Sequence, residues 1–251
     1  MLGKINLEDI KNIAKLAGDA IMGIYNQDFT IEYKDDTSPL TQADLKANDI
    51  ICTKLLELYP NIPIISEETK QVDYKIRKHW EYYWCIDPLD GTKEFIKRNG
   101  EFTVNIALIE YNIPVLGVVY APVSQELYSA KKNAGAFKNN IKLPIKRDDN
   151  NFIILASRSH LSEDTKTYIE NIETTKKKII INKGSSLKLC MIAEGVADIY
   201  PRLSPTMEWD TAAADAIVRE SGKYSYQLNS TKLLEYNKKN LLNPYFEIRG
   251  N

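Results

Sequence analysis

The stretch "CIDPLDGTKEF" (residues 85–95) places two aspartates, Asp87 and Asp90, at the end of an apolar segment. A proline lies between them and restricts the backbone, and Gly91 and Thr92 follow where a helix can begin. Two interpretations compete. The acids belong either to an ordinary strand-to-helix turn that they cap, or to a metal site that binds phosphate.

The metal interpretation rests on the donors that this spacing brings together. Asp87 and Asp90 can direct two carboxylates to one point, together with the backbone carbonyl of Leu89. Mg²⁺ prefers such oxygen ligands and commonly takes one or two carboxylates, several waters and a substrate phosphate. The N–H groups of Gly91 and Thr92 would face a phosphate oxygen at a helix start. The stretch therefore predicts a Mg²⁺ site that holds a phosphate group.

Further acids lie where strands end or helices begin. Each has an ordinary explanation. Asp44 follows Thr41 as in an acidic capping box, and Asp210 suits a helix N-terminus. Glu67 and Glu68 would be solvated charges in a loop. Gathered at one place without a cation, however, these carboxylates would repel one another and raise some of their pKa values. Their joint occurrence favours the metal site.

The composition narrows the class of protein. The chain has 251 residues, 43% of them hydrophobic, and a formal charge of −1, which gives no electrostatic case for nucleic-acid or membrane-surface binding. It has two histidines, so any metal must be held by oxygen. The three cysteines are far apart in apolar contexts and indicate reduced core residues: Cys52, Cys85 and Cys190.

The order of predicted elements changes near the middle of the chain. Apolar periodicity predicts helices over 6–25 and from about Thr41 to a stop before Pro60, followed by strands that include 62–66 and 81–87. A hairpin and then short strands around Gly135 follow. After the polar segment "KRDDNN" (146–151), strands and helices alternate as in a βαβ unit. We therefore expect two domains, 1–147 and 148–251.

Four ordered motifs resemble those of a known family: "DTSPLTQAD", "ISEE", "DPLDGTKEF" and "WDTAAAD". They are similar to the acid pair, the D-P-[IL]-D-[GS]-T segment and the W-D pair of the inositol-monophosphatase superfamily of Mg²⁺-dependent, Li⁺-sensitive phosphatases. Together with "GVVYAPV", "SRSH" and "GSSLK", the resemblance covers most of the chain and points to its CysQ branch, the 3'(2'),5'-bisphosphate nucleotidases.

The resemblance implies a role for each matching residue. Catalytic residues would be Asp44, Glu67 and Thr92, with Asp44 and Thr92 as a hydrogen-bonded pair that deprotonates or orients the attacking water. Two or three Mg²⁺ ions would be bound by five residues: Glu67, Asp87, Leu89 through its carbonyl, Asp90 and Asp210.

The resemblance also implies the substrate contacts, although "SRSH" and "GSSLK" taken alone would read as turn chemistry. Substrate contacts would include the site residues Glu67, Leu89, Asp90, Gly91, Thr92 and Asp210. A nucleotide and its second phosphate would add Ser157, His160, Gly184, Ser185, Lys188 and Arg202. A monophosphorylated polyol needs no such second cationic pocket, which favours adenosine 3',5'-bisphosphate as the substrate, hydrolysed to AMP and phosphate.

The implied fold is a layered αβαβα sandwich of mixed α+β and α/β type, with the active site between its two halves. The alternative activities are an inositol monophosphatase or a fructose bisphosphatase of the same fold, and a nucleotide-binding protein without catalysis. The expected partner is the small-molecule substrate, with no nucleic acid and no transmembrane segment. We expect a cytoplasmic protein, which could associate peripherally with the inner face of the cell membrane.

The chain departs from the family pattern in two places. Gly222–Lys223 stands where a glycine pair is common, and Ala214 followed by Asp215 stands where CysQ-like chains often have glycine. The first predicts a turn variant, and the second adds an acid to the helix that carries Asp210.

Overall fold

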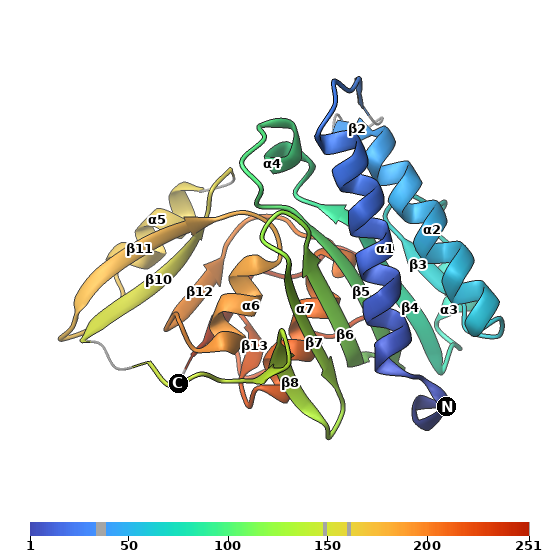
Figure 1. The fold of residues 1–251 in the computed structure, drawn as a ribbon. Helices are drawn as coiled ribbons and strands as arrows, with labels where there is room; N and C mark the ends of the chain where they lie inside the picture. The colour runs from blue at the N-terminus through green and yellow to red at the C-terminus, as the bar shows by residue number, and fades with distance from the viewer. Residues whose placement is uncertain (34–38, 148–149, 160–161, 251) are drawn as a thin grey trace.

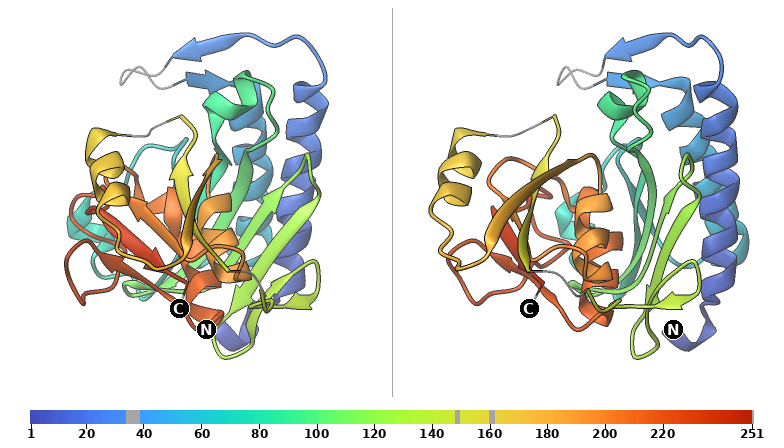
Figure 2. Two further views of the ribbon diagram at one scale, coloured as in Figure 1. Left: turned by 90° about the vertical axis from the view of Figure 1, so that its left-hand side faces the viewer. Right: turned by 60° about the vertical axis from the view of Figure 1, so that its left-hand side comes forward.

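The computed structural model describes residues 1–33, 39–147, 150–159 and 162–250. Its helices and sheets form five layers, in the order helices, larger sheet, helices, smaller sheet and helix (Figure 1, Figure 2). The expected αβαβα sandwich is confirmed. None of the described helices has the length and apolar character that crossing a membrane requires.

The first layer consists of α1 (Leu7–Tyr25) and α2 (Gln42–Leu58), as the apolar periodicity predicts. The side chain of Asn6 accepts a hydrogen bond from the N–H of Glu8 and so caps α1. Thr41 and Asp44 form the expected capping box at the start of α2. Both helices bury their apolar faces against the larger sheet.

The larger sheet has seven strands in sequence order, with β3 and β4 parallel and every other neighbouring pair antiparallel. Its strands are β3 (Ile64–Ser66), β4 (Tyr82–Asp90), β5 (Thr103–Glu110), β6 (Ile113–Ala121), β7 (Glu126–Lys131), β8 (Gly135–Lys138) and β9 (Ile141–Lys142). β4 runs beyond the predicted residue 87, because the D-P-L-D segment stays in the sheet with a shift of register between Asp87 and Asp90.

The middle layer contains α6 (Leu187–Glu194) and α7 (Glu208–Glu220), which lie between the two sheets. α7 packs closely on β5 and β6 through its small residues. At Gly117 of β6, an added Cβ would lie 2.1 Å from the carbonyl oxygen of Ala213 and 2.9 Å from Cβ of Ala216. Only glycine therefore allows α7 to approach the sheet this closely.

The smaller sheet has the strand order β11-β10-β12-β14-β13, and α5 (Glu163–Glu170) covers its outer face. Its strands are β10 (Asn151–Ser157), β11 (Lys177–Lys183), β12 (Ile199–Arg202), β13 (Tyr224–Gln227) and β14 (Phe246–Arg249). β10 pairs in parallel with β11 and β12, as a βαβ unit predicts, whereas β14 is antiparallel to its neighbours. The last two strands were absent from the sequence prediction.

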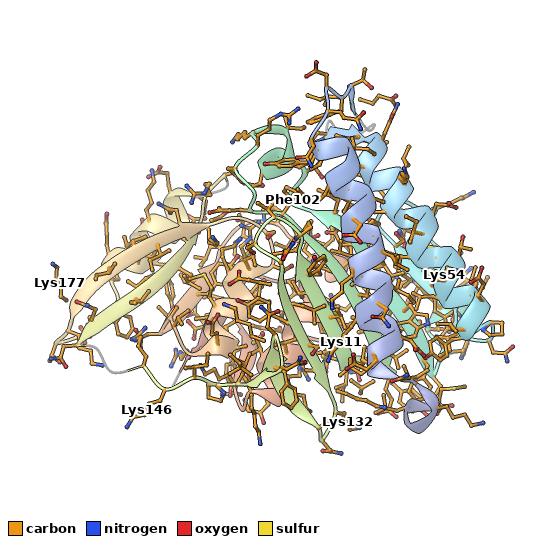
Figure 3. All side chains as sticks on the ribbon, viewed as in Figure 1. Lys11, Lys54, Phe102, Lys132, Lys146 and Lys177 are labelled. Carbon is orange, nitrogen blue, oxygen red and sulfur yellow. The ribbon has the colours of Figure 1, made fainter. Side chains whose placement is uncertain are left out.

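The remaining elements are short: η1 (Leu2–Lys4), β1 (Ile31–Tyr33), β2 (Pro39–Thr41), α3 (Tyr74–Arg77) and α4 (Thr92–Ile96). α4 lies at one end of the larger sheet, close to β2 and the start of α2 (Figure 1). Figure 3 shows side chains filling the space between the layers, whereas Lys146 and Lys177 extend away from the surface.

The three described cysteines are free thiols, and Cys85 and Cys190 belong to the core between the sheets, as expected. The boundary expected near residue 147 falls between the last strand of the larger sheet and the first strand of the smaller one. We retain 1–147 and 148–251 as a proposal for the two domains, with one apolar core shared across their boundary.

Candidate active site

The end of β4 forms the centre of the site. Asp87 is 1% exposed, and its Oδ1 accepts a hydrogen bond from the N–H of Leu89 at 3.1 Å. Gly91 then turns the chain with φ of +95°, and a Cβ there would lie 3.1 Å from the carbonyl oxygen of Glu101. The chain must therefore have glycine at the position that redirects β4 into α4.

Three carboxylates from separate elements meet at this corner. Glu67 directly follows β3, and its N–H donates to the carbonyl of Ile86, so the parallel pairing of β3 with β4 brings it beside Asp87. Asp210 comes from the first turn of α7. One oxygen from each of Glu67, Asp87 and Asp210 lies within 4.8 Å of the others, a spacing that suits a bound cation.

Asp90 adjoins this triplet, and its carboxylate is fixed by three donors. Its Oδ2 accepts hydrogen bonds from the N–H and the hydroxyl of Ser186, both at 2.6 Å, and from Nδ2 of Asn105 at 3.3 Å. The capping interpretation of Asp90 is wrong: the N-cap of α4 is Gly91, and no side chain caps that helix.

Asp87, Asp90 and Asp210 share one pattern, in which the hydrogen bonds from described donors fall on one carboxylate oxygen. Oδ2 of Asp210 accepts from the N–H of Met207 at 2.8 Å, as a helix-start acid does, while Asp87 and Asp90 are held as described above. Such bonds orient carboxylates before a cation binds. The helix-start and metal-ligand interpretations of Asp210 are therefore compatible.

Burial and mutual repulsion make this cluster costly when no cation is bound. Burial, followed by the charges of Glu67, Asp90 and Asp210, holds the pKa of Asp87 well above its usual range. Burial and the charges of Asp90 and Glu67 do the same to the pKa of Asp210. Burial also raises the pKa of Asp90, although its bonds to Ser186 partly oppose this. A divalent cation would remove the repulsion, and the all-oxygen donor set fits Mg²⁺.

The predicted Asp44–Thr92 pair is present. Asp44 is 1% exposed, its Oδ2 accepts from the N–H and the hydroxyl of Thr41, and its Oδ1 lies 3.1 Å from Oγ1 of Thr92. Burial raises the pKa of Asp44, although the hydroxyl bonds oppose this. The Thr92 hydroxyl also lies 3.3 Å from the carbonyl of Leu89. The capping box and the pair with Thr92 thus use different oxygens of Asp44.

A cavity of about 270 Å³ opens in front of the acids, with residues from both halves of the chain around it. Its lining contains most of the sequence-predicted residues: Glu67, Asp87, Leu89, Asp90, Gly91, Thr92, Ser157, Gly184, Ser185, Lys188, Arg202 and Asp210. Asp44 lies behind Thr92. His160 lies outside the described residues.

Lys188 and Arg202 supply positive charge opposite the acids. Lys188 is 4% exposed, and its Nζ donates to the carbonyls of Lys183 at 3.1 Å and Ser185 at 2.5 Å. Burial, with the neighbouring charge of Arg202, lowers the pKa of Lys188 to about 8. Arg202 donates to the carbonyl of Pro205 at 3.0 Å, and its buried Nε has no partner among the described residues. Lys188 therefore also shapes the loop that carries Ser185.

The sequence interpretation missed several residues that build the cavity wall. Glu101 accepts a forked pair of bonds from Arg158 and one from the N–H of Gly184 at 2.8 Å, which joins the two halves beside the cavity. Although burial opposes it, these bonds lower the pKa of Glu101. Glu94, also in the cavity lining, accepts from Ser159 at 2.5 Å. Arg158 and Ser159 belong to the "SRSH" motif, but the sequence does not indicate that they bind Glu101 and Glu94.

The two departures from the family pattern are explained by packing away from the cavity. Asp215 is fully buried and pairs with Arg219 one helical turn later, with Nε and Oδ2 2.9 Å apart. Lys223 donates to the carbonyl of Ile192 in the last turn of α6. Ala214 is buried within the core between the sheets. None of these residues faces the described acids.

Comparisons with known proteins agree with this site. The family model described as "Inositol monophosphatase family" matches residues 6–243. A 3'(2'),5'-bisphosphate nucleotidase CysQ of Salmonella typhimurium strain LT2 is 44% identical over 247 residues, which cover 96% of this chain and 98% of that protein. The protein of the same name from Buchnera aphidicola is 47% identical over 222 residues, covering 86% and 82%.

A solved structure extends the likeness to three dimensions. The crystal structure of CysQ from Bacteroides thetaiotaomicron, described as a bacterial member of the inositol monophosphatase family, superposes with a TM-score of 0.89. It is 44% identical, and the match covers 97% of this chain and 96% of that one.

Proposed function

Because the chain belongs to the inositol monophosphatase family, we propose that it is a Mg²⁺-dependent 3'(2'),5'-bisphosphate nucleotidase. Its reaction is the hydrolysis of adenosine 3',5'-bisphosphate at the 3'-phosphate, which gives AMP and inorganic phosphate. The observation that carries this proposal is one cavity that combines a carboxylate cluster with two buried cationic side chains, in a chain 44% identical to a named nucleotidase over nearly its full length.

The carboxylates define where the ester to be cleaved binds. Glu67, Asp87, Asp90 and Asp210, with the carbonyl of Leu89, would hold two or three Mg²⁺ ions. The bound ions supply positive charge that offsets charge on the transferred phosphate and the oxygens that attack and leave. Gly91 and Thr92 line the same cavity at the start of α4, a helix that has no side-chain capping bond, and their N–H groups would donate to the phosphate.

The pair of Thr92 and Asp44 orients the attacking water and accepts its proton. The Thr92 hydroxyl donates to Asp44, so its oxygen accepts a hydrogen bond from water on the side of the cavity. This arrangement orients the water for in-line attack on phosphorus, and burial makes the Asp44 carboxylate a better proton acceptor by raising its pKa. As the new P–O bond forms, the water gives up a proton through the Thr92 hydroxyl to Asp44. The P–O bond to the ribose breaks at the same time, and the ribose oxygen leaves as an alkoxide that takes a proton from solvent.

The cations on the opposite side of the cavity select the substrate. A second phosphate needs positive charge, and Lys188 and Arg202 are the cationic side chains in the C-terminal part of the lining. Ser157, Gly184 and Ser185 line the same cavity and would contact the nucleotide. His160 remains a predicted contact. A cytoplasmic location likewise remains a prediction from the sequence.

A substrate panel tests the proposal. Phosphate release should be fastest with adenosine 3',5'-bisphosphate, slower with inositol 1-phosphate and fructose 1,6-bisphosphate, and abolished in each case by EDTA. Asp90→Asn should reduce turnover by about 100-fold or more, with an unchanged circular dichroism spectrum. If inositol 1-phosphate were the best substrate, the chain would be a monophosphatase. Binding of the bisphosphate without phosphate release in Mg²⁺ would make it a binding protein.

A further inference from the structure

We infer that Ser186 is a positioning residue that fixes the Asp90 carboxylate for cation binding and ties it to the substrate loop, defined here as residues 183–188. This inference rests on the proposed function, because Asp90 is taken as a metal ligand. Ser186 is 1% exposed, so its hydroxyl acts only on its protein neighbours.

The hydroxyl of Ser186 lies at the centre of a buried hydrogen-bond network. Its Oγ is 2.6 Å from Oδ2 of Asp90 and 2.7 Å from the carbonyl oxygen of Asp210, and it accepts from Nδ2 of Asn105 at 2.7 Å. Oδ1 of Asn105 accepts in turn from Thr103. One serine hydroxyl therefore contacts two residues assigned as metal ligands, from opposite halves of the chain.

The position of Ser186 makes this use of its hydroxyl unusual. Ser186 is the N-cap of α6, where a serine oxygen normally accepts a hydrogen bond from the helix N–H groups. Here the side chain makes no capping bond and points to Asp90 instead. The helix start thus forgoes a stabilising capping interaction, which argues that the hydroxyl serves the site rather than α6.

The hydrogen bonds from Ser186 determine which oxygen of Asp90 remains available to bind a cation. Oδ2 accepts from the N–H of Ser186 and from Nδ2 of Asn105. The single proton of the Ser186 hydroxyl is shared between this oxygen and the carbonyl of Asp210. The carboxylate is thereby locked with Oδ1 directed away from these donors. Bonds of this kind commonly change metal affinity 10- to 100-fold when they are removed.

The same residue connects the cation site to the proposed second-phosphate site. Ser186 follows Ser185, whose carbonyl accepts from the Lys188 amine, and Gly184 is anchored to Glu101. Asp90 is therefore joined directly to the loop that carries the proposed substrate contacts. Cation binding and nucleotide binding should consequently strengthen each other, and by the same factor in both directions.

The test is the affinity of the purified protein for Mn²⁺ without substrate, followed by the electron paramagnetic resonance signal of the free ion. Ser186→Ala should raise the dissociation constant about 10-fold, since its backbone N–H still reaches Asp90. Turnover should fall at low Mg²⁺ and recover to within about threefold at saturating Mg²⁺. Addition of AMP should tighten Mn²⁺ binding in the wild type and do so less in the variant.

The matched control is Ser225→Ala, which also removes a fully buried hydroxyl, but one with no partner among the described residues and outside the cavity lining. It should bind Mn²⁺ as the wild type does and unfold in EDTA at the wild-type temperature or above, because its hydroxyl has no partner to lose among the described residues. Ser186→Ala leaves Asn105 and Asp90 with fewer hydrogen bonds and should unfold at a somewhat lower temperature. Should Ser186→Ala fail to fold, Ser186→Cys preserves the volume, weakens the donor and carries the same prediction.

The outcomes separate this inference from the proposed function. If the wild type binds Mn²⁺ and hydrolyses the bisphosphate while the Ser186 variants bind Mn²⁺ equally well, Ser186 has no positioning role. If the wild type neither binds Mn²⁺ nor releases phosphate, the proposed function itself fails. A loss in Ser186→Ala that saturating Mg²⁺ does not recover would mean general damage to the fold and would also overturn the inference.

Discussion

Oγ1 of Thr92 lies 3.1 Å from Oδ1 of Asp44, although the two residues are 48 positions apart. Asp44 belongs to a helix that covers one face of the larger sheet, and Thr92 begins the short helix at the end of β4. The other oxygen of Asp44 accepts two hydrogen bonds from Thr41. The capping box therefore orients the Asp44 carboxylate so that its Oδ1 points to Thr92. The helix cap and the proposed catalytic pair thus depend on the same side chain.

The Asp44–Thr92 pair should behave as one unit in kinetics. Asp44→Asn and Thr92→Val should each lower kcat by about 100-fold or more, because either change removes the oriented proton acceptor. The double variant should be little worse than the poorer single variant. Thr92→Ser retains the hydroxyl and is the matched control. Losses that simply multiply in the double variant would show that the two residues act independently.

The acid cluster should make the cation-free protein more stable when one of its charges is removed. In EDTA at neutral pH, Asp87→Asn should unfold at a higher temperature than the wild type, because burial and the neighbouring acids disfavour the Asp87 carboxylate. In Mg²⁺ the wild type should unfold at the higher temperature, because only the wild type has all the carboxylates that bind and stabilise the ion.

The pH dependence of this difference follows from the sign of the shift. The pKa of Asp87 lies above its unfolded value of 3.8, so the folded protein binds more protons than the unfolded chain in the interval between them. The free energy of unfolding in EDTA should therefore fall as the pH rises from about 4, and fall less in Asp87→Asn. If the free energy of unfolding changed with pH in the same way for the wild type and Asp87→Asn, the proposed repulsion among the site acids would be contradicted.

Lys188 should determine specificity for the second phosphate. Lys188→Met keeps the length of the side chain but removes the charge, and should raise KM more for adenosine 3',5'-bisphosphate than for inositol 1-phosphate. Because burial lowers the pKa of Lys188 to about 8, the charge is lost as the pH rises through that value. KM for the bisphosphate should therefore rise above pH 8 in the wild type and stay flat in the variant. Equal losses on both substrates would indicate that Lys188 acts only by shaping its loop.

The close approach of α7 to the sheet should be sensitive to a single methyl group. Gly117→Ala would place a Cβ 2.1 Å from the carbonyl of Ala213 and should lower the free energy of unfolding by about 1–3 kcal/mol. Since α7 carries Asp210, Mg²⁺ affinity should fall as well. Gly23→Ala is the control, because nothing lies within 4 Å of its added Cβ on α1, and it should be neutral or slightly stabilising. Equal stability of the two variants would mean that α7 can shift without cost.

The sequence points to acids that the fold brings close together, because each belongs to a local pattern. The capping box at Thr41 and the D-P-L-D segment are encoded within a few residues, and the predicted helices and central strands follow from apolar periodicity. The four motifs therefore identify Glu67, Asp87, Asp90 and Asp210 before any contact between them is known.

The parts that sequence reasoning missed depend on contacts between distant segments. Ser186 lies in the "GSSLK" motif, which taken alone suggests turn chemistry, and only the fold shows its hydroxyl directed at Asp90. Lys188 reads as a free cation, whereas its amine is engaged by two backbone carbonyls. β14 pairs between β12 and β13 at the end of the chain, and its four residues carry no periodicity long enough to predict.

The most direct test of the whole account is an anomalous difference map from a crystal soaked in Mn²⁺, an ion that takes the same oxygen ligands as Mg²⁺. The account predicts strong peaks in contact with Glu67, Asp87, Asp90 and Asp210, and their loss in Asp87→Asn. A map with no peak among these carboxylates, from crystals that show bound Mn²⁺ elsewhere, would contradict it.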